Sequence, residues 1–175
     1  MAAQKRVKPV LYTIGHSTRS LAEFKELLRV FEIKTVIDIR SIPKSRHNPQ
    51  FSAARLKRSL EAGGLGYVWI ERLGGLRHAR KDSINLGWRN VSFRGYADYM
   101  ATPEFADGLK KLMRLAQKKP TAITCAEAVP WRCHRSLIAD ALGKQGWSVR
   151  HIISKTSAPP HRFTPFLKMR HGILT

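Results

Sequence analysis

The sequence predicts a single compact α/β domain with a mostly parallel sheet of about five strands flanked by helices. Short apolar runs of strand type alternate with amphipathic stretches of helix length, and this order builds a parallel sheet through right-handed crossovers. The length of 175 residues fits one domain, and 43% hydrophobic residues with 12 Gly and 9 Pro exclude wholesale disorder, collagen or a coiled coil. We place the domain at residues 1–154 and a basic tail at 155–175.

The first elements follow from residue pattern and caps. The apolar run 10–14 predicts a strand, and Ser20 with Glu23 forms a capping box that opens a helix over 21–31. The β-branched run 35–40 suits a strand buried on both faces of a parallel sheet. We therefore expect a strand, a helix and a second strand in the first 40 residues.

The middle of the chain contains one clear helix and one long irregular stretch. Ser52 is the predicted cap of a helix that ends before Gly63, and the run 66–70 predicts a third strand. From 73 to 93 no period holds, and a connection of this length is usually functional or mobile.

Two more helices and two more strands complete the predicted sheet. A Thr-Pro-Glu start opens a helix over 102–116, and Pro130 opens another that runs to about 145. The runs 121–125 and 148–153 are predicted strands. The tail holds three prolines, four Lys or Arg and no acid. It is either a disordered arm that orders on nucleic acid or a segment that packs on the domain.

Polar side chains concentrate where the predicted strands end. In open α/β sheets, ligands bind beyond the carboxyl ends of the strands. Four segments fall there: 15–17, 38–46, 71–75 and 125–135. We therefore expect the functional site at this edge of the sheet.

Net charge gives the first indication of a partner. The chain has 32 Lys+Arg against 12 Asp+Glu, so its formal net charge is +20. Such an excess attracts polyanions, and the usual cellular polyanion is nucleic acid, with DNA expected before RNA. An acidic protein, an anionic membrane surface or simple solubility are the alternatives. No apolar run is long enough to span a bilayer and no signal peptide is apparent, so we expect a cytoplasmic protein without membrane association.

Pro130 opens a predicted helix whose first turn combines a thiol with basic side chains. Arg132, His134 and Arg135 fall where the helix dipole favours an anion, so they are candidate ligands of a phosphate or carboxylate. Alternatively, the arginines only pair with nearby acids. The same field would lower the pKa of Cys133 and make it a candidate nucleophile, although buried cysteines are more often inert.

Metal and cofactor sites are not predicted. A structural zinc site usually brings a close cysteine pair and a second pair elsewhere, whereas Cys125 and Cys133 are eight positions apart and no second pair exists. Neither a P-loop nor a dinucleotide-binding glycine motif occurs. We therefore expect no metal and no cofactor.

A second cluster of candidates surrounds Asp38. This carboxylate lies in an apolar strand, where it must be paired, and Arg40 on the same face is the obvious partner. A buried structural pair is one interpretation. In the other, Asp38 and Glu127 converge and divide the roles of acid and base. Their pocket would be ringed by Arg40, Arg46 and Arg135.

His16, Trp88 and Arg89 complete the candidate site residues. His16 follows the first strand and is either a proton donor or a turn residue. Trp88 and Arg89 lie in the irregular stretch, where aromatic rings alternate with cations. This mixture suits single-stranded or flipped-out bases, which need stacking surfaces beside phosphate-binding cations.

Several separated motifs resemble one known family. They are Tyr12-Thr13-Ile14-Gly15-His16-Ser17, then Asp38-Ile39-Arg40 with Pro43, Ser45-Arg46 and Phe51, then Cys125 with Glu127, Pro130 and Cys133-His134-Arg135. In this order they resemble the family called domain of unknown function 488, from about residue 11 to residue 153. The resemblance implies a compact α/β domain whose motifs line one pocket, and it implies no common activity.

Charge and converging motifs together predict a nucleic-acid-binding protein, namely a small DNA-processing enzyme of repair or base modification. Such an enzyme takes a base out of the stack and needs carboxylates in its pocket. Asp38 and Glu127 would act as acid and base, and His16 or Cys133 would assist. The alternatives are a thiol enzyme that acts on a small anionic substrate through Cys133, and a nucleic-acid-binding module without catalysis.

Overall fold

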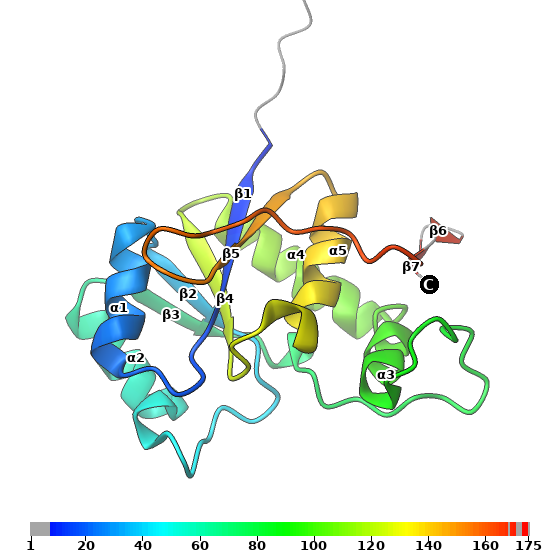
Figure 1. Cartoon of the computed structure of the whole chain (residues 1–175), viewed down its shortest axis with the longest axis horizontal. Helices are drawn as coiled ribbons and strands as arrows, with labels where there is room; N and C mark the ends of the chain where they lie inside the picture. The colour runs from blue at the N-terminus through cyan, green and yellow to red at the C-terminus, as the bar shows by residue number, and fades with distance from the viewer. Residues whose placement is uncertain (1–7, 168, 171–172, 175) are drawn as a thin grey trace, which may run out of the picture.

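A five-stranded parallel sheet in the order β3-β2-β4-β1-β5 runs through the middle of the molecule (Figure 1). The structure is a computed structural model that describes residues 8–167, 169–170 and 173–174. The strands of this sheet are β1 Val10–Gly15, β2 Thr35–Asp38, β3 Gly66–Trp69, β4 Thr121–Cys125 and β5 Ser148–Ile152. The predicted α/β class is confirmed, and each strand ends within two residues of its predicted bounds.

Helices cover both faces of the sheet (Figure 1). On one face lie α1 Leu21–Val30 and α2 Ala53–Ala62, and on the other lie α4 Pro103–Ala116 and α5 Arg135–Lys144. Along the described chain, none of the helices combines the length and the apolarity needed to cross a bilayer.

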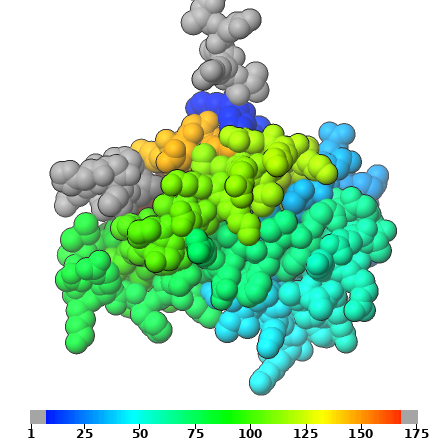
Figure 2. Space-filling model, turned by 180° about the vertical axis from the view of Figure 1, so that it is seen from behind, coloured from blue at the N-terminus to red at the C-terminus, as the bar shows by residue number. Residues whose placement is uncertain are grey.

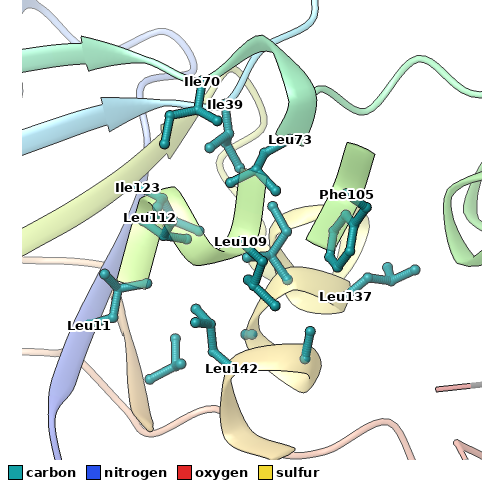
Figure 3. Packing of buried hydrophobic residues seen from close by; sticks show 14 of the residues in the cluster. Leu11, Ile39, Ile70, Leu73, Phe105, Leu109, Leu112, Ile123, Leu137 and Leu142 are labelled. Atoms are coloured by element: carbon teal, nitrogen blue, oxygen red, sulfur yellow. The ribbon is translucent and has the colours of Figure 1, made fainter. Parts of the chain in front are cut away.

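Alternation along the strands divides the buried residues between two cores. In β2, Val36 packs with α1 and α2, whereas Ile37 packs with α4 and α5. Figure 3 shows the second core, in which Leu11 and Ile123 of the sheet lie near Leu112 of α4. Because helices cover both faces, the loops at the strand ends are the accessible parts of the sheet.

Two helix starts show how far local capping signals hold. The capping box is confirmed: Glu23 N donates to Ser20 Oγ at 3.1 Å and Ser20 N donates to Glu23 Oε2 at 2.7 Å. Ser52 precedes α2 as predicted, but within the described residues its hydroxyl makes no capping bond. Its own N–H donates to the Pro49 carbonyl at 3.1 Å, so a preceding 3₁₀ turn leads the chain into α2.

The helix predicted from Pro130 to 145 is divided in the structure. A 3₁₀ turn at Pro130–Arg132 is followed by Cys133 in an extended conformation, with φ −132° and ψ 147°, and α5 begins at Arg135. Pro130 does start a helical turn, as expected. The extended residue interrupts it and places the Cys133 and His134 side chains against the strand ends.

Helix α3, Val91–Tyr99, is not apparent from the sequence pattern because its buried face includes Gly95 and Asp98. Asp98 also fixes the irregular stretch before it. Its carboxylate accepts hydrogen bonds at 2.6 to 2.9 Å from Ser83 Oγ, Asn85 Nδ2 and Arg80 N. Seen from behind, this stretch and α4 form much of the molecular surface (Figure 2).

Residues 155–167, which we call the strap, pack on the domain. Asp140 of α5 is fully buried and accepts hydrogen bonds from His161 Nε2 at 2.9 Å, Thr164 N at 3.0 Å and Thr164 Oγ1 at 2.8 Å. Further on, β6 Met169–Arg170 pairs with β7 Ile173–Leu174. Of the predicted domain and tail, residues 1–7, 168, 171–172 and 175 lie outside the described residues.

Candidate functional site

The carboxyl ends of β1 and β4 lie at a point where neighbouring strands connect in opposite directions. From β1 the chain passes through α1 to β2, and from β4 it passes through α5 to β5 on the other side. Ligand sites of open α/β sheets lie at such points. A cavity of about 690 Å³ opens here. Its chemically active lining residues are His16, Arg40, Lys44, Cys125, Glu127, Arg132, Cys133 and His134.

Gly15 lets the two strand ends approach closely. β1 and β4 are in register at Gly15 and Cys125, and the ladder continues when His16 N donates to the Cys125 carbonyl at 3.0 Å. A Cβ on Gly15 would collide with the Glu127 carbonyl oxygen. The missing side chain therefore allows the loop after β4 to cross over the end of β1.

Two thiols and an imidazole meet at one part of the cavity. His134 Nε2 lies 3.0 Å from the Ile39 carbonyl, which can only accept, so Nε2 is the donor and Nδ1 faces the sulfurs. Nδ1 lies 3.6 Å from Cys133 Sγ and 4.0 Å from Cys125 Sγ. A Cβ on Gly75 would strike the His134 ring. Close packing from both sides thus fixes the ring beside the thiols.

Arg135 is the most unusual group behind this cluster. Its side chain is 1% exposed, yet no carboxylate of a described residue lies within 4.0 Å of it. Nη2 donates to the backbone carbonyls of Glu127 and Ala128, and Nε donates to Cys133 Sγ at 3.4 Å. A buried cation requires an anion, and Cys133 is the ionisable group in contact with it. The arrangement therefore favours Cys133 as a thiolate.

The surroundings of the two sulfurs separate their acidities. A hydrogen bond from Cys125 lowers the pKa of Cys133 well below its ordinary value, and the hydrogen bond and charge of His134 and the charge of Arg135 act in the same direction. The hydrogen bond to Cys133, followed by burial, raises the pKa of Cys125 well above its ordinary value. The surroundings thus favour the thiolate form of Cys133 and the thiol form of Cys125.

The same three residues have donor atoms that suit a soft metal ion. Cys125 Sγ, Cys133 Sγ and His134 Nδ1 lie within 4.8 Å of one another, and thiolate and imidazole are ligands of Zn²⁺. The guanidinium of Arg135 already donates to Cys133 Sγ and adds positive charge there. That charge opposes a bound cation and stabilises a thiolate without metal.

Asp38 and Arg40 form a buried ion pair. Arg40 Nη2 donates to Asp38 Oδ2 at 2.5 Å and Arg40 Nε donates to Oδ1 at 2.9 Å, while Tyr67 Oη donates to Oδ2 at 2.8 Å. Asp38 is fully buried and does not line the cavity, so the structure does not bring it together with Glu127. Arg40 and Tyr67 enclose both carboxylate oxygens, which leaves the guanidinium as the part of the pair that reaches the cavity.

His16 is a neutral acceptor rather than a charged group. Burial is the main cause that lowers its pKa to about 4. Nδ1 lies 3.1 Å from the Ser17 carbonyl and therefore carries the proton, so Nε2 accepts from Arg40 Nη1 at 3.3 Å. The ring also stacks on Phe51 with centroids 4.3 Å apart. His16 thereby orients the guanidinium of Arg40 at the cavity.

The remaining predicted site residues fall into three places. Glu127 and Arg132 are exposed and line the cavity. Arg46 and Arg89 are exposed away from it. Trp88 is 9% exposed and packs against Phe93 at 5.5 Å between ring centroids, so its ring faces the core and is not open to stack on a base.

Cys125 is the site residue that sequence reasoning left out of the proposed chemistry. Its place at the end of β4 was the available signal, since strand ends point into the cavity. What the sequence could not indicate is that the chain bends at Cys133 and returns that sulfur to Cys125.

The comparison with family models gives one match. The model described as "Domain of unknown function DUF488" matches residues 20–142, a range that includes Asp38, Arg40, Cys125 and Cys133. Neither the curated proteins nor the solved structures include a match to the chain.

Proposed function

The chain belongs to the DUF488 family, whose activity is unknown, and from its own site we propose that it is a thiol-dependent enzyme acting on a small anionic substrate. Cys133 is the nucleophile, and the cavity at the ends of β1 and β4 holds the substrate. The observation that carries the proposal is the buried Arg135: among the described residues, its neighbouring acidic group is the sulfur of Cys133 and not a carboxylate.

A thiolate is the reactive form of cysteine, and in this site protein groups rather than water stabilise its charge. Cys133 is 4% exposed but lines the cavity, so a ligand in the cavity reaches its sulfur. Arg135 approaches the sulfur from the interior, and His134 Nδ1 approaches it at 3.6 Å. These groups stabilise the negative charge before a substrate arrives.

The lining charges favour an anion. Arg40, Lys44 and Arg132 face the cavity, against one lining carboxylate, Glu127. Of the five N–H groups of Arg40, three bond to Asp38 and His16, and the other two have no partner among the described residues. A carboxylate or phosphate could take both in a bidentate arrangement.

The proposed reaction begins with attack of Cys133 on an electrophilic centre beside that anionic group. A bond from sulfur to the centre forms while the bond to the leaving group breaks, and the leaving group takes the electron pair. Glu127, on the cavity lining, can deliver a proton to it or activate the water that releases the covalent product.

Alkylation by two related reagents tests both parts of the proposal. We expect Cys133 to react with iodoacetamide at pH 6 about tenfold faster than free cysteine, located by peptide mapping. The ratio of the rate with negatively charged iodoacetate to the rate with iodoacetamide should be several-fold higher for Cys133 than for free cysteine. The double variant Arg132→Gln, Lys44→Gln should lose this preference for iodoacetate and keep the rate with iodoacetamide. Labelling of Cys133 no faster than free cysteine would overturn the proposal.

A second candidate function is nucleic-acid binding, with DNA as the preferred partner over RNA. The net charge of +20 favours this function. Arg132 on the cavity lining supplies a cation, and the adjoining Trp131, which is 72% exposed, supplies a stacking ring. Fluorescence titration against DNA and RNA should show affinity that falls with salt, with a log–log slope of about −0.9 per phosphate contacted on duplex DNA. Cys133→Ser should bind equally well. No binding at low salt would exclude this function.

A further inference from the structure

A second thiol lies beside the proposed nucleophile, and its only role so far is to lower the pKa of Cys133. Cys125 ends β4, is 9% exposed and lines the same cavity as Cys133. The two sulfurs and His134 Nδ1 lie within 4.8 Å of one another. A nucleophilic cysteine does not require a neighbouring thiol, so this placement needs its own explanation.

We propose that Cys125 is the resolving thiol of Cys133. A hydroperoxide oxidises Cys133 to a sulfenic acid, and Cys125 then forms a reversible disulfide with it. This inference rests on the proposed function, because it requires Cys133 to be the reactive thiolate of the cavity.

The first step transfers one oxygen atom. The Cys133 thiolate attacks the outer oxygen of the hydroperoxide, so an S–O bond forms and the O–O bond breaks. The leaving alkoxide, or hydroxide from hydrogen peroxide, takes the electron pair and a proton from water. Arg40 lines the same cavity, and its two N–H groups that have no partner among the described residues can stabilise that developing charge. Sulfur loses two electrons and the peroxide gains them.

The second step closes the disulfide. Cys125 Sγ attacks the oxidised sulfur, and the thiol proton of Cys125 passes to the hydroxyl group that leaves it. The S–S bond forms, the S–OH bond breaks, and hydroxide leaves with that proton as water. A small thiol later reduces the disulfide, and two such molecules are oxidised to their own disulfide.

The backbone at Cys133 allows the two sulfurs to meet. A disulfide needs the sulfurs about 2.05 Å apart, so they must approach from their present separation. Cys133 is in an extended conformation between a short 3₁₀ turn and α5, and this conformation directs its side chain toward Cys125. Its backbone stays bonded on both sides, because Cys133 N donates to the Pro130 carbonyl at 3.1 Å and Ser136 N donates to the Cys133 carbonyl at 3.0 Å. The 3₁₀ turn carries the exposed Trp131 and is not part of the sheet.

Closure of the disulfide would switch the enzyme off reversibly. It removes the nucleophile and prevents further oxidation of Cys133 to the sulfinic acid, which thiols do not reverse. Cys133 must be oxidised first and Cys125 must attack it second. Cys125 suits the second step because it stays a thiol until Cys133 is oxidised.

The test treats the full chain with one equivalent of hydrogen peroxide at pH 7 and follows intact mass and thiol content. Wild type should lose two hydrogen atoms and both thiols, and dithiothreitol should restore them. Cys125→Ser should instead gain oxygen and be trapped by a 1,3-diketone. Cys133→Ser, the matched control, should keep its remaining thiol.

The outcomes separate this inference from the proposed function. If wild type gains oxygen without losing two hydrogens, Cys133 is reactive but Cys125 does not resolve it, and the inference is wrong. If wild type neither oxidises nor is alkylated rapidly at pH 6, both proposals fail. The wild-type mass decides the first case even if a variant does not fold.

Discussion

At the scale of single residues, the chemistry of the site depends on Arg135, a buried guanidinium that has no carboxylate partner among the described residues. Removing a charge from water costs several kcal/mol unless an opposite charge compensates it. Arg40 meets this requirement through Asp38, whereas Arg135 meets it through backbone carbonyls and Cys133 Sγ. Two buried arginines at one site therefore have different roles: one presents N–H groups to the cavity, and the other stabilises a thiolate.

Arg135→Met should reduce the alkylation rate of Cys133 at pH 6 about tenfold. Methionine keeps much of the volume but removes the charge, so the Cys133 pKa should rise. At pH 6 a cysteine of ordinary pKa is less than about 1% thiolate, although each such thiolate is intrinsically more reactive. The pH dependence of alkylation measures the change. Arg89→Met, at an exposed position away from the cavity, is the control, and an unchanged profile in Arg135→Met would contradict the thiolate assignment.

Gly75→Ala should displace His134 and slow the same alkylation. A Cβ at this position would overlap the imidazole ring, which has no space to retreat while Nε2 donates to the Ile39 carbonyl. Gly63→Ala is the matched control, because its Cβ would have its nearest neighbour at 3.4 Å. Equal rates in the two variants would mean that His134 does not support the thiolate.

At the scale of elements, the connection between β4 and α5 decides which side chains meet. A continuous helix from Pro130 would carry Cys133 along the helix surface. The extended residue at Cys133 divides the connection, so that Cys133 joins Cys125 at the strand end and Arg135 enters the interior. The start of α5 thus places a buried cation two residues after the proposed nucleophile.

The strap should detach when its buried anchor is removed. Asp140 accepts three hydrogen bonds from the strap, two of them from Thr164, and His161 Nδ1 in turn lies 3.0 Å from His151 Nε2. Asp140→Asn should lower the free energy of unfolding by about 3 kcal/mol. It should also expose residues 155–167 to limited proteolysis. Asp82→Asn, at an exposed pair, should change neither, and a protected strap in Asp140→Asn would contradict the anchor.

At the scale of the whole molecule, stability should fall between pH 6.5 and pH 4. Burial lowers the pKa of His16 and of His151 to about 4 from an ordinary 6.5. Between these pH values the unfolded chain binds more protons than the folded chain, so lowering the pH favours unfolding. For each histidine, the free energy of unfolding falls by at most about 1.4 kcal/mol per pH unit. Urea denaturation at pH 7.5, 6.0 and 5.0 measures the slope. His16→Gln should flatten it and exposed His47→Gln should not; equal slopes would contradict the neutral state of His16.

The sequence by itself determined the order along the chain of the five sheet strands and of the helices other than α3, the capping box, the excess of positive charge and the edge of the sheet where polar groups gather. These properties depend on short-range pattern, so they can be read from neighbouring residues. Only the tertiary structure decided which of those polar groups share the cavity. Asp38 turned to Arg40 and Tyr67, while Cys125 met Cys133 and Arg135 lost access to solvent. Such pairings depend on strand order, on the bend at Cys133 and on close approaches at Gly15 and Gly75. Those features arise from packing between distant segments, which local pattern does not encode.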